Sequence, residues 1–139
     1  ENIIKDFSGT KTADLARAYA GISYSRLGNN EKALEYLNKF KGGDLLITPA
    51  IAGAIGDVYM NMGDTEKAIS HFNNAAQKAN DEMLTPIYYN KVGLAYLSVK
   101  NYDKAIETFQ MIKDKYLNSP QGQEADKYIE AAKLQKAGN

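Results

Sequence analysis

The sequence contains no cysteine and no tryptophan, and it has a single histidine, His71. Without cysteine, the chain has no disulfides, no thiolate nucleophile and no cysteine-ligated zinc. It also lacks a glycine-rich phosphate loop, a G-x-S-x-G motif and an H-E-x-x-H motif. We interpret His71 as a helix residue at the solvent edge, the alternative being a lone general base or ligand. The sequence therefore predicts no enzyme activity, no catalytic residue, no metal site and no cofactor.

An excess of charge of one sign is missing as well, because 17 basic residues balance 17 acidic ones. A nucleic-acid binder needs a basic surface that displaces counterions from phosphate, so we expect no nucleic-acid partner. No apolar run reaches the ~18 residues of a membrane span. The longest is short and is broken by Thr48 and Pro49, so we expect no direct membrane contact from this segment. Apolar residues still make up 44% of the chain, which suffices for a continuous core.

The sequence does contain one pattern that occurs three times, at steps of 35 and 37 residues. A self-similarity with this period is the mark of a repeat architecture. In each unit a glycine is followed by a tyrosine, then by an alanine preceded by lysine, and finally by a large apolar residue. The repeated positions are Gly21, Gly56 and Gly93; Tyr24, Tyr59 and Tyr96; Ala33, Ala68 and Ala105; and Leu37, Phe72 and Phe109.

Each unit is predicted to be a pair of helices. The first helix of the second unit shows apolar residues at three- and four-residue steps: Ile51, Ile55, Val58 and Met62. A hydroxyl residue that would cap the helix, followed by a proline at the first helical position, marks the helix starts at Thr48–Pro49, Thr85–Pro86 and Ser119–Pro120. Asp64 is expected to cap the second helix of that unit.

The small repeated residues are expected to let the paired helices approach closely. Gly56 and Ala68 would lie where the helices cross, at the roughly 8–10 Å spacing of close helix packing, and Phe72 would fill the space beside them. Gly28 and Gly63 fall in the turns between paired helices, where a left-handed conformation is often required. The third unit has Lys100 there, so we expect that turn to be strained or differently shaped, with Asn101 as its cap.

This pattern resembles the tetratricopeptide repeat family over about residues 13–118. The resemblance implies an all-α fold, an α-solenoid with a right-handed superhelix made of three helix–turn–helix units and a C-terminal capping helix. The units are expected at about 13–47, 48–84 and 85–118, and the capping helix at about 119–135. Together they would form one domain over residues 10–139, with residues 1–9 as the tail of a preceding helix. The sequence departs from the family at Arg17 and Ala52, where a large apolar residue is usual.

The resemblance also implies where a partner would bind. In this family the first helix of each pair lines a concave groove that holds peptides or other proteins. The residues predicted to line it for partner binding are Tyr19, Ile22, Arg26, Asp57, Met60, Asn61, Ile87, Asn90, Lys91 and Leu94. Tyr19, Met60 and Asn61 fall off the core stripe, whereas Ile22, Ile87 and Leu94 suit core and groove equally. Some family members grip the C-terminal carboxylate of chaperones with a Lys, Asn and Arg clamp, and only Lys91 has suitable charge here, so we expect no such clamp.

The leading interpretation is therefore a scaffold for protein–protein interaction. The alternative is a structural or self-association role, in which the groove packs on a missing N-terminal part of the protein or on a second copy, giving a homo-oligomer. RNA binding is a further rival, because pentatricopeptide repeats share a similar layout. Resemblance to repeat proteins of the bacterial envelope suggests that compartment, with any membrane anchor upstream of this chain.

Overall fold

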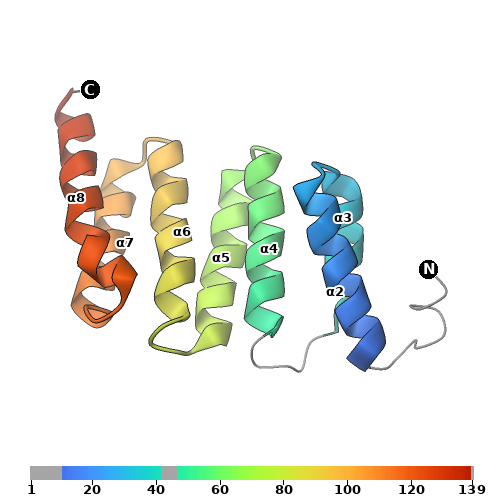
Figure 1. Cartoon of the computed structure of the whole chain (residues 1–139). Helices are drawn as coiled ribbons and strands as arrows, with labels where there is room; N and C mark the ends of the chain where they lie inside the picture. The colour runs from blue at the N-terminus through green and yellow to red at the C-terminus, as the bar shows by residue number, and fades with distance from the viewer. Residues whose placement is uncertain (1–10, 42–46, 139) are drawn as a thin grey trace.

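The computed structural model describes residues 11–41 and 47–138, and all regular structure in this part of the chain is helical. The helices are α2 (Lys11–Arg26), α3 (Asn30–Asn38), α4 (Ile47–Asn61), α5 (Thr65–Ala79), α6 (Thr85–Ser98), α7 (Tyr102–Lys115) and α8 (Pro120–Gly138). Each packs mainly against its neighbours in the sequence. Figure 1 shows α2, α4 and α6 side by side in one layer, with α3, α5 and α7 behind them. The prediction of an all-α solenoid is confirmed, while the predicted tail at 1–9 lies outside the described residues.

The repeated glycines sit where a side chain has no room. A Cβ atom on Gly56 would stand 2.5 Å from the ring of Phe72, and one on Gly93 would stand 2.5 Å from the ring of Phe109. Gly21 meets Leu37 in the same way, at 2.6 Å. In each repeat the large apolar residue of the second helix therefore packs on the glycine of the first helix. This contact explains why both residues recur at one spacing.

The three turns between paired helices have the same shape. Gly28 and Gly63 adopt left-handed backbone angles, with φ of 79° and 81°, and Lys100 does so too, with φ of 61°. In each turn the following residue donates its backbone N–H to a tyrosine carbonyl one turn back, at 2.9 Å. Asn101 then caps α7 by accepting a hydrogen bond from the backbone N–H of Lys104, as expected. The third turn is therefore strained at Lys100 and is not differently shaped.

The lysine of each repeat lies over the tyrosine of the same repeat. The distances from lysine Nζ to the ring centre are 5.4 Å for Lys32 and Tyr24, 5.5 Å for Lys67 and Tyr59, and 5.8 Å for Lys104 and Tyr96. A cation at this distance is attracted by the negative face of the ring. The contact ties the second helix of each pair to the first, and it accounts for a lysine that the sequence pattern left unexplained.

Two predicted helix starts are wrong, that of α4 by two residues and that of α6 by one. Helix α4 begins at Ile47 and α6 at Thr85, so neither Thr48 nor Thr85 is the capping residue. Thr85 instead joins neighbouring segments, because its Oγ1 donates to the Ala76 carbonyl at 3.0 Å and accepts from the Asp81 N–H at 3.0 Å. Met62, expected on the apolar face of its helix, lies beyond the end of α4 and is exposed.

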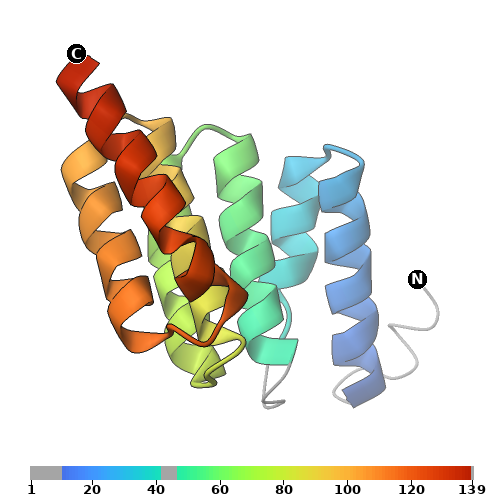
Figure 2. The same cartoon turned by 60° about the vertical axis from the view of Figure 1, so that its left-hand side comes forward.

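Helix α8 covers the last pair of helices. Its start is as predicted, since Ser119 Oγ accepts from the Gly122 N–H at 3.0 Å and Pro120 follows at the first helical position. Ala125, Ile129 and Ala132 are buried against α7, and Tyr128 stacks on Phe109 with ring centres 4.8 Å apart. Figure 2 shows α8 crossing in front of this end of the array. The helix therefore extends the core formed by the third repeat.

Candidate functional site

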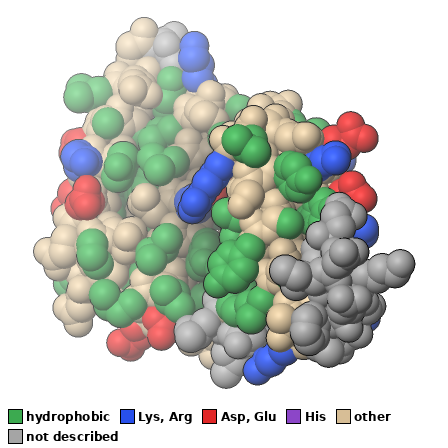
Figure 3. Space-filling model, turned by 45° about the vertical axis from the view of Figure 1, so that its right-hand side comes forward, with side chains coloured by type: hydrophobic (Ala, Val, Ile, Leu, Met, Phe, Trp, Pro, Cys, Tyr) green, Lys and Arg blue, Asp and Glu red, His purple; other side chains and the backbone are tan. Residues whose placement is uncertain are grey.

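A hollow of about 340 Å³ crosses the first helices of all three pairs. Helices α2, α4 and α6 contribute its wall: Ile22, Ser25 and Arg26; Ala50, Gly53, Ala54 and Asp57; and Ile87, Tyr88 and Lys91. Figure 3 shows a hollow on this side of the molecule, with hydrophobic side chains around it and a basic side chain within it. Segments that are far apart in the sequence thus form one surface.

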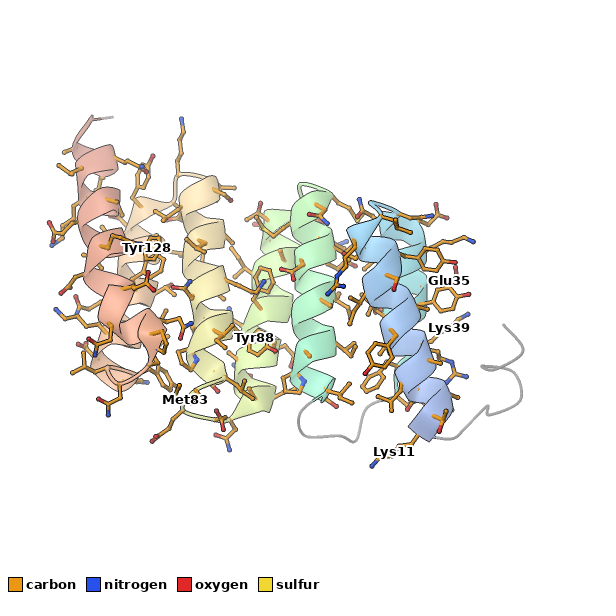
Figure 4. All side chains as sticks on the ribbon, in the orientation of Figure 1. Lys11, Glu35, Lys39, Met83, Tyr88 and Tyr128 are labelled. Carbon is orange, nitrogen blue, oxygen red and sulfur yellow. The ribbon has the colours of Figure 1, made fainter. Side chains whose placement is uncertain are left out.

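Tyr88 shapes the apolar wall of the hollow. Its ring reaches from α6 to α4 and lies against Gly53, where an added Cβ would stand 2.6 Å from Cε1 of the ring (Figure 4). Burial raises the pKa of Tyr88, and the nearby charge of Asp57 raises it further. The phenol is therefore neutral at physiological pH, and it presents both an apolar face and a polar hydroxyl to the hollow.

One ion pair crosses the hollow. Lys91 Nζ of α6 lies 2.8 Å from Oδ1 of Asp57 of α4, and the two side chains are 37% and 47% exposed. The same Nζ stands 5.5 Å from the centre of the Phe72 ring. A half-exposed pair of this kind contributes about 0–1 kcal/mol to stability. Its clearer effect is to fix the positions of the Lys91 and Asp57 side chains in the lining of the hollow.

Arg26 is the third charged residue of the hollow, and it forms no ion pair with any described residue. It lies in the last turn of α2, where the carbonyl ends of the helix favour a positive charge. Because Asp57 neutralises Lys91, the charge of the hollow equals that of Arg26. The lining is thus largely apolar, and Arg26 is its one cation without an ion pair among the described residues.

Models of the tetratricopeptide repeat match the sequence over residues 48–116 and, separately, over residues 16–42, and together these matches cover more than half of the chain. The chain belongs to the tetratricopeptide repeat family. As such it is a repeat scaffold of the kind that mediates protein–protein interactions. A search of curated proteins returns no match.

Five of the residues predicted for the groove of this tetratricopeptide repeat protein line the hollow together: Ile22, Arg26, Asp57, Ile87 and Lys91. Tyr19, Asn61 and Leu94 lie outside it and are exposed. Asn90 lies outside it too, with its Oδ1 buried and without a partner among the described residues. Met60 packs against the core cluster of Ala68, Phe72 and Val92, so the expectation that it falls off the core stripe is wrong.

The register of the first helices also assigns Ser25, Gly53 and Ala54 to the groove, and it misses two lining residues, Tyr88 and Ala50. Tyr88 was overlooked because it follows Ile87 directly and does not share the register used for the other groove residues. A signal was present in Gly53, a glycine inside a helix and three residues before the repeated Gly56. A mid-helix glycine that belongs to no repeat pattern indicates a close neighbour, and here that neighbour is Tyr88.

Two other hollows among the described residues lie at edges of the repeat array. One of about 460 Å³ lies at the turns around α5, α6 and α7, and one of about 420 Å³ lies beside the α5–α6 connection. Neither collects side chains from three repeats. In the described part of the chain no acidic or histidine cluster is suited to a metal ion, and no helix is long and apolar enough to span a membrane. The hollow across α2, α4 and α6 is therefore the candidate site.

Proposed function

We propose that this chain holds a segment of a partner protein in the hollow across α2, α4 and α6. The observation that carries the proposal is the convergence of three repeats on one surface that is partly apolar and still open. Ile87 stands 37% exposed in its lining, and Ala54 contributes a small apolar side chain. An inserted side chain would remove this apolar surface from water, which favours binding by about 25 cal/mol per Å² before the costs of association.

The length of the hollow suits an extended segment or one face of a helix. Its residues come from three parallel helices of one layer, so a bound segment would run across them and contact each in turn. This is the way in which helix-in-groove and extended-peptide binders use a row of side-chain contacts. Tyr88 and Ile87 would provide the apolar contacts, and Arg26, Asp57 and Lys91 the polar ones.

Two variants separate this surface from the rest of the molecule. Ile87→Glu places a charge in the hollow, whereas Met83→Glu places the same charge on an exposed apolar residue outside the hollow, at the turn before α6 (Figure 4). Affinity capture from cell extract, followed by binding of the purified candidates, should show partners that are lost from Ile87→Glu and retained by Met83→Glu. If all captured proteins bind both variants equally, the hollow is not the binding site.

Self-association is tested with the same variants. Analytical ultracentrifugation of the wild-type chain should show a monomer whose mass does not change in Ile87→Glu. A stable dimer that dissociates in Ile87→Glu and persists in Met83→Glu would mean that a second copy occupies the hollow instead.

A further inference from the structure

We infer that the partner segment inserts a side-chain carboxylate, from Asp or Glu, beside Arg26, and places a bulky apolar residue next to it against Ile87 and Tyr88. This inference rests on the proposed function and specifies its ligand. The occupant is an internal acidic stretch of another protein, neither a basic segment nor a free chain end.

The charges of the hollow require an anion. The chain as a whole is neutral, but the hollow is not, because the one carboxylate in it already binds Lys91 at 2.8 Å. Arg26 has no carboxylate partner among the described residues, so within this part of the chain its positive charge is uncompensated. A basic segment would lie beside two cations, Arg26 and Lys91, and beside the Asp57 carboxylate, which is already paired. Such a contact between like charges is unfavourable.

The donor geometry favours a carboxylate among anions. The arginine guanidinium is planar and presents paired N–H donors that match the two oxygens of a carboxylate. Lys91 adds to this, since its ammonium has three N–H donors and Asp57 Oδ1 uses one of them. Arg26 and Lys91 line the same hollow of about 340 Å³, so one carboxylate would be drawn toward both.

The apolar wall sets what stands next to the carboxylate. Ile22 and Ala54 pack at the edge of the core formed by α2–α4, and Ile87 and the ring of Tyr88 continue this surface on α6. A Leu, Ile or Phe of the partner fits such a wall, while the acidic residue beside it reaches the rim at Arg26. The pattern expected in a partner is therefore an acidic residue close to a bulky apolar one.

An internal side chain fits better than a free C-terminus. Capture of a chain end relies on a nest of backbone donors or on several cations and amides around one carboxylate. Here one arginine without an ion pair among the described residues and one shared lysine are available, and much of the remaining lining is small or apolar, Ala50 included. We therefore assign the carboxylate to a residue within the bound segment.

A phage-displayed random peptide library is the probe. Selection on the wild-type chain should enrich peptides with Asp or Glu at one fixed distance from a Leu, Ile or Phe. Selection on Arg26→Gln should lose the acidic preference and keep the apolar one. Arg26→Glu should turn the preference to Lys or Arg. These variants are expected to fold, because Arg26 is exposed and makes no ion pair with the described residues.

The best selected peptide then allows a charge exchange. We expect its affinity to fall about three- to fivefold with Arg26→Gln, as for a partly exposed ion pair. High salt should weaken the binding of the peptide to the wild-type chain, because salt screens that ion pair. A peptide in which the acidic residue is replaced by Lys should bind Arg26→Glu better than wild type. Amidation of the peptide C-terminus should leave the affinity unchanged.

The outcomes separate the inference from the function on which it rests. Peptides that bind wild type and Met83→Glu but not Ile87→Glu, without any acidic preference, would overturn the inference and support the groove. Loss of binding on amidation would overturn it in favour of a chain end. An acidic preference that survives in Arg26→Gln would also overturn it. Failure to enrich any peptide, or equal binding to Ile87→Glu, would overturn both.

Discussion

The ring of Tyr88 takes the place of a side chain on Gly53. The two residues belong to different repeats, and a Cβ on Gly53 would stand 2.6 Å from Cε1 and 3.2 Å from Cδ1 of the ring. Because the ring is half-buried at the edge of the hollow, this contact decides the shape of the candidate site. In contrast, Gly56, one turn further along α4, faces the fully buried Phe72.

Replacement of Gly53 by Ala should therefore change binding more than stability. Tyr88 is at the surface of the hollow and turns aside, while the gain in helix propensity from Gly to Ala is about 1 kcal/mol. We expect a free energy of unfolding within about 1 kcal/mol of wild type in urea, together with a weaker affinity for peptides selected on the wild-type hollow. The matched variant Gly56→Ala should lose about 1–3 kcal/mol, because Phe72 cannot move without disturbing the core. Equal losses of stability in the two variants would contradict this account.

Replacement of Lys100 by Gly should stabilise the chain. Lys100 holds the left-handed conformation that Gly28 and Gly63 adopt in the equivalent turns. Relief of this strain should stabilise the folded chain by about 1–2 kcal/mol. Glycine also makes the unfolded chain more flexible, and this offsets about 0.5–1 kcal/mol of that gain. We expect a higher midpoint of urea unfolding. Lys78→Gly, in the last turn of α5, is the control and should lower that midpoint by removing helix propensity.

The contact between Lys67 and Tyr59 should be measurable as a coupling free energy. Lys67 Nζ stands 5.5 Å from the ring centre, and the lysine side chain is 64% exposed. A double-mutant cycle with Lys67→Gln and Tyr59→Leu should give a coupling of about 0.5 kcal/mol, typical of an exposed cation–π contact. The same cycle with Lys78→Gln in place of Lys67→Gln should give a coupling near zero. No difference between the two cycles would mean that the repeated lysine has another role.

The stability of the chain should fall below neutral pH because of His71. Its imidazole stacks on Tyr59 with ring centres 5.3 Å apart, and burial lowers its pKa from the ordinary value of 6.5. The unfolded chain therefore binds the proton more readily, so the contribution of neutral His71 is complete above about pH 6.5 and is lost as the pH falls through the lower pKa of the folded state. Urea unfolding at about pH 7.5 and 5.5 measures this loss. It should be smaller in His71→Gln, and an equal loss in that variant would show that other groups are responsible.

The helices and turns were predictable because they depend on spacing within each repeat. Gly56 predicts the contact with Phe72, and Asn101 predicts the cap of α7 even though Lys100 replaces the expected glycine. The errors at Thr48 and Thr85 are errors of two residues and one residue at a helix end. At such positions several local hydrogen-bond patterns compete, and Thr85 makes its bonds to the preceding helix and turn, which no local pattern reveals.

The groove was predictable only in part, because its position depends on how one repeat sits on the next. The register of the first helices placed Ile22, Asp57 and Lys91 on one surface. It failed for Met60, which is partly buried and packs against the core cluster of α5 and α6. It also failed for Tyr88, whose direction follows from the space above Gly53.

The sequence by itself determined the repeat, the paired helices and the left-handed turns, because these follow from steric rules that act over a few residues and from a pattern that returns at a fixed interval. Only the tertiary structure decided which side chains share the hollow. Lys91 and Asp57 are 34 positions apart in the chain, and they form an ion pair and share a hollow with Arg26 because stacking brings three helices to one surface.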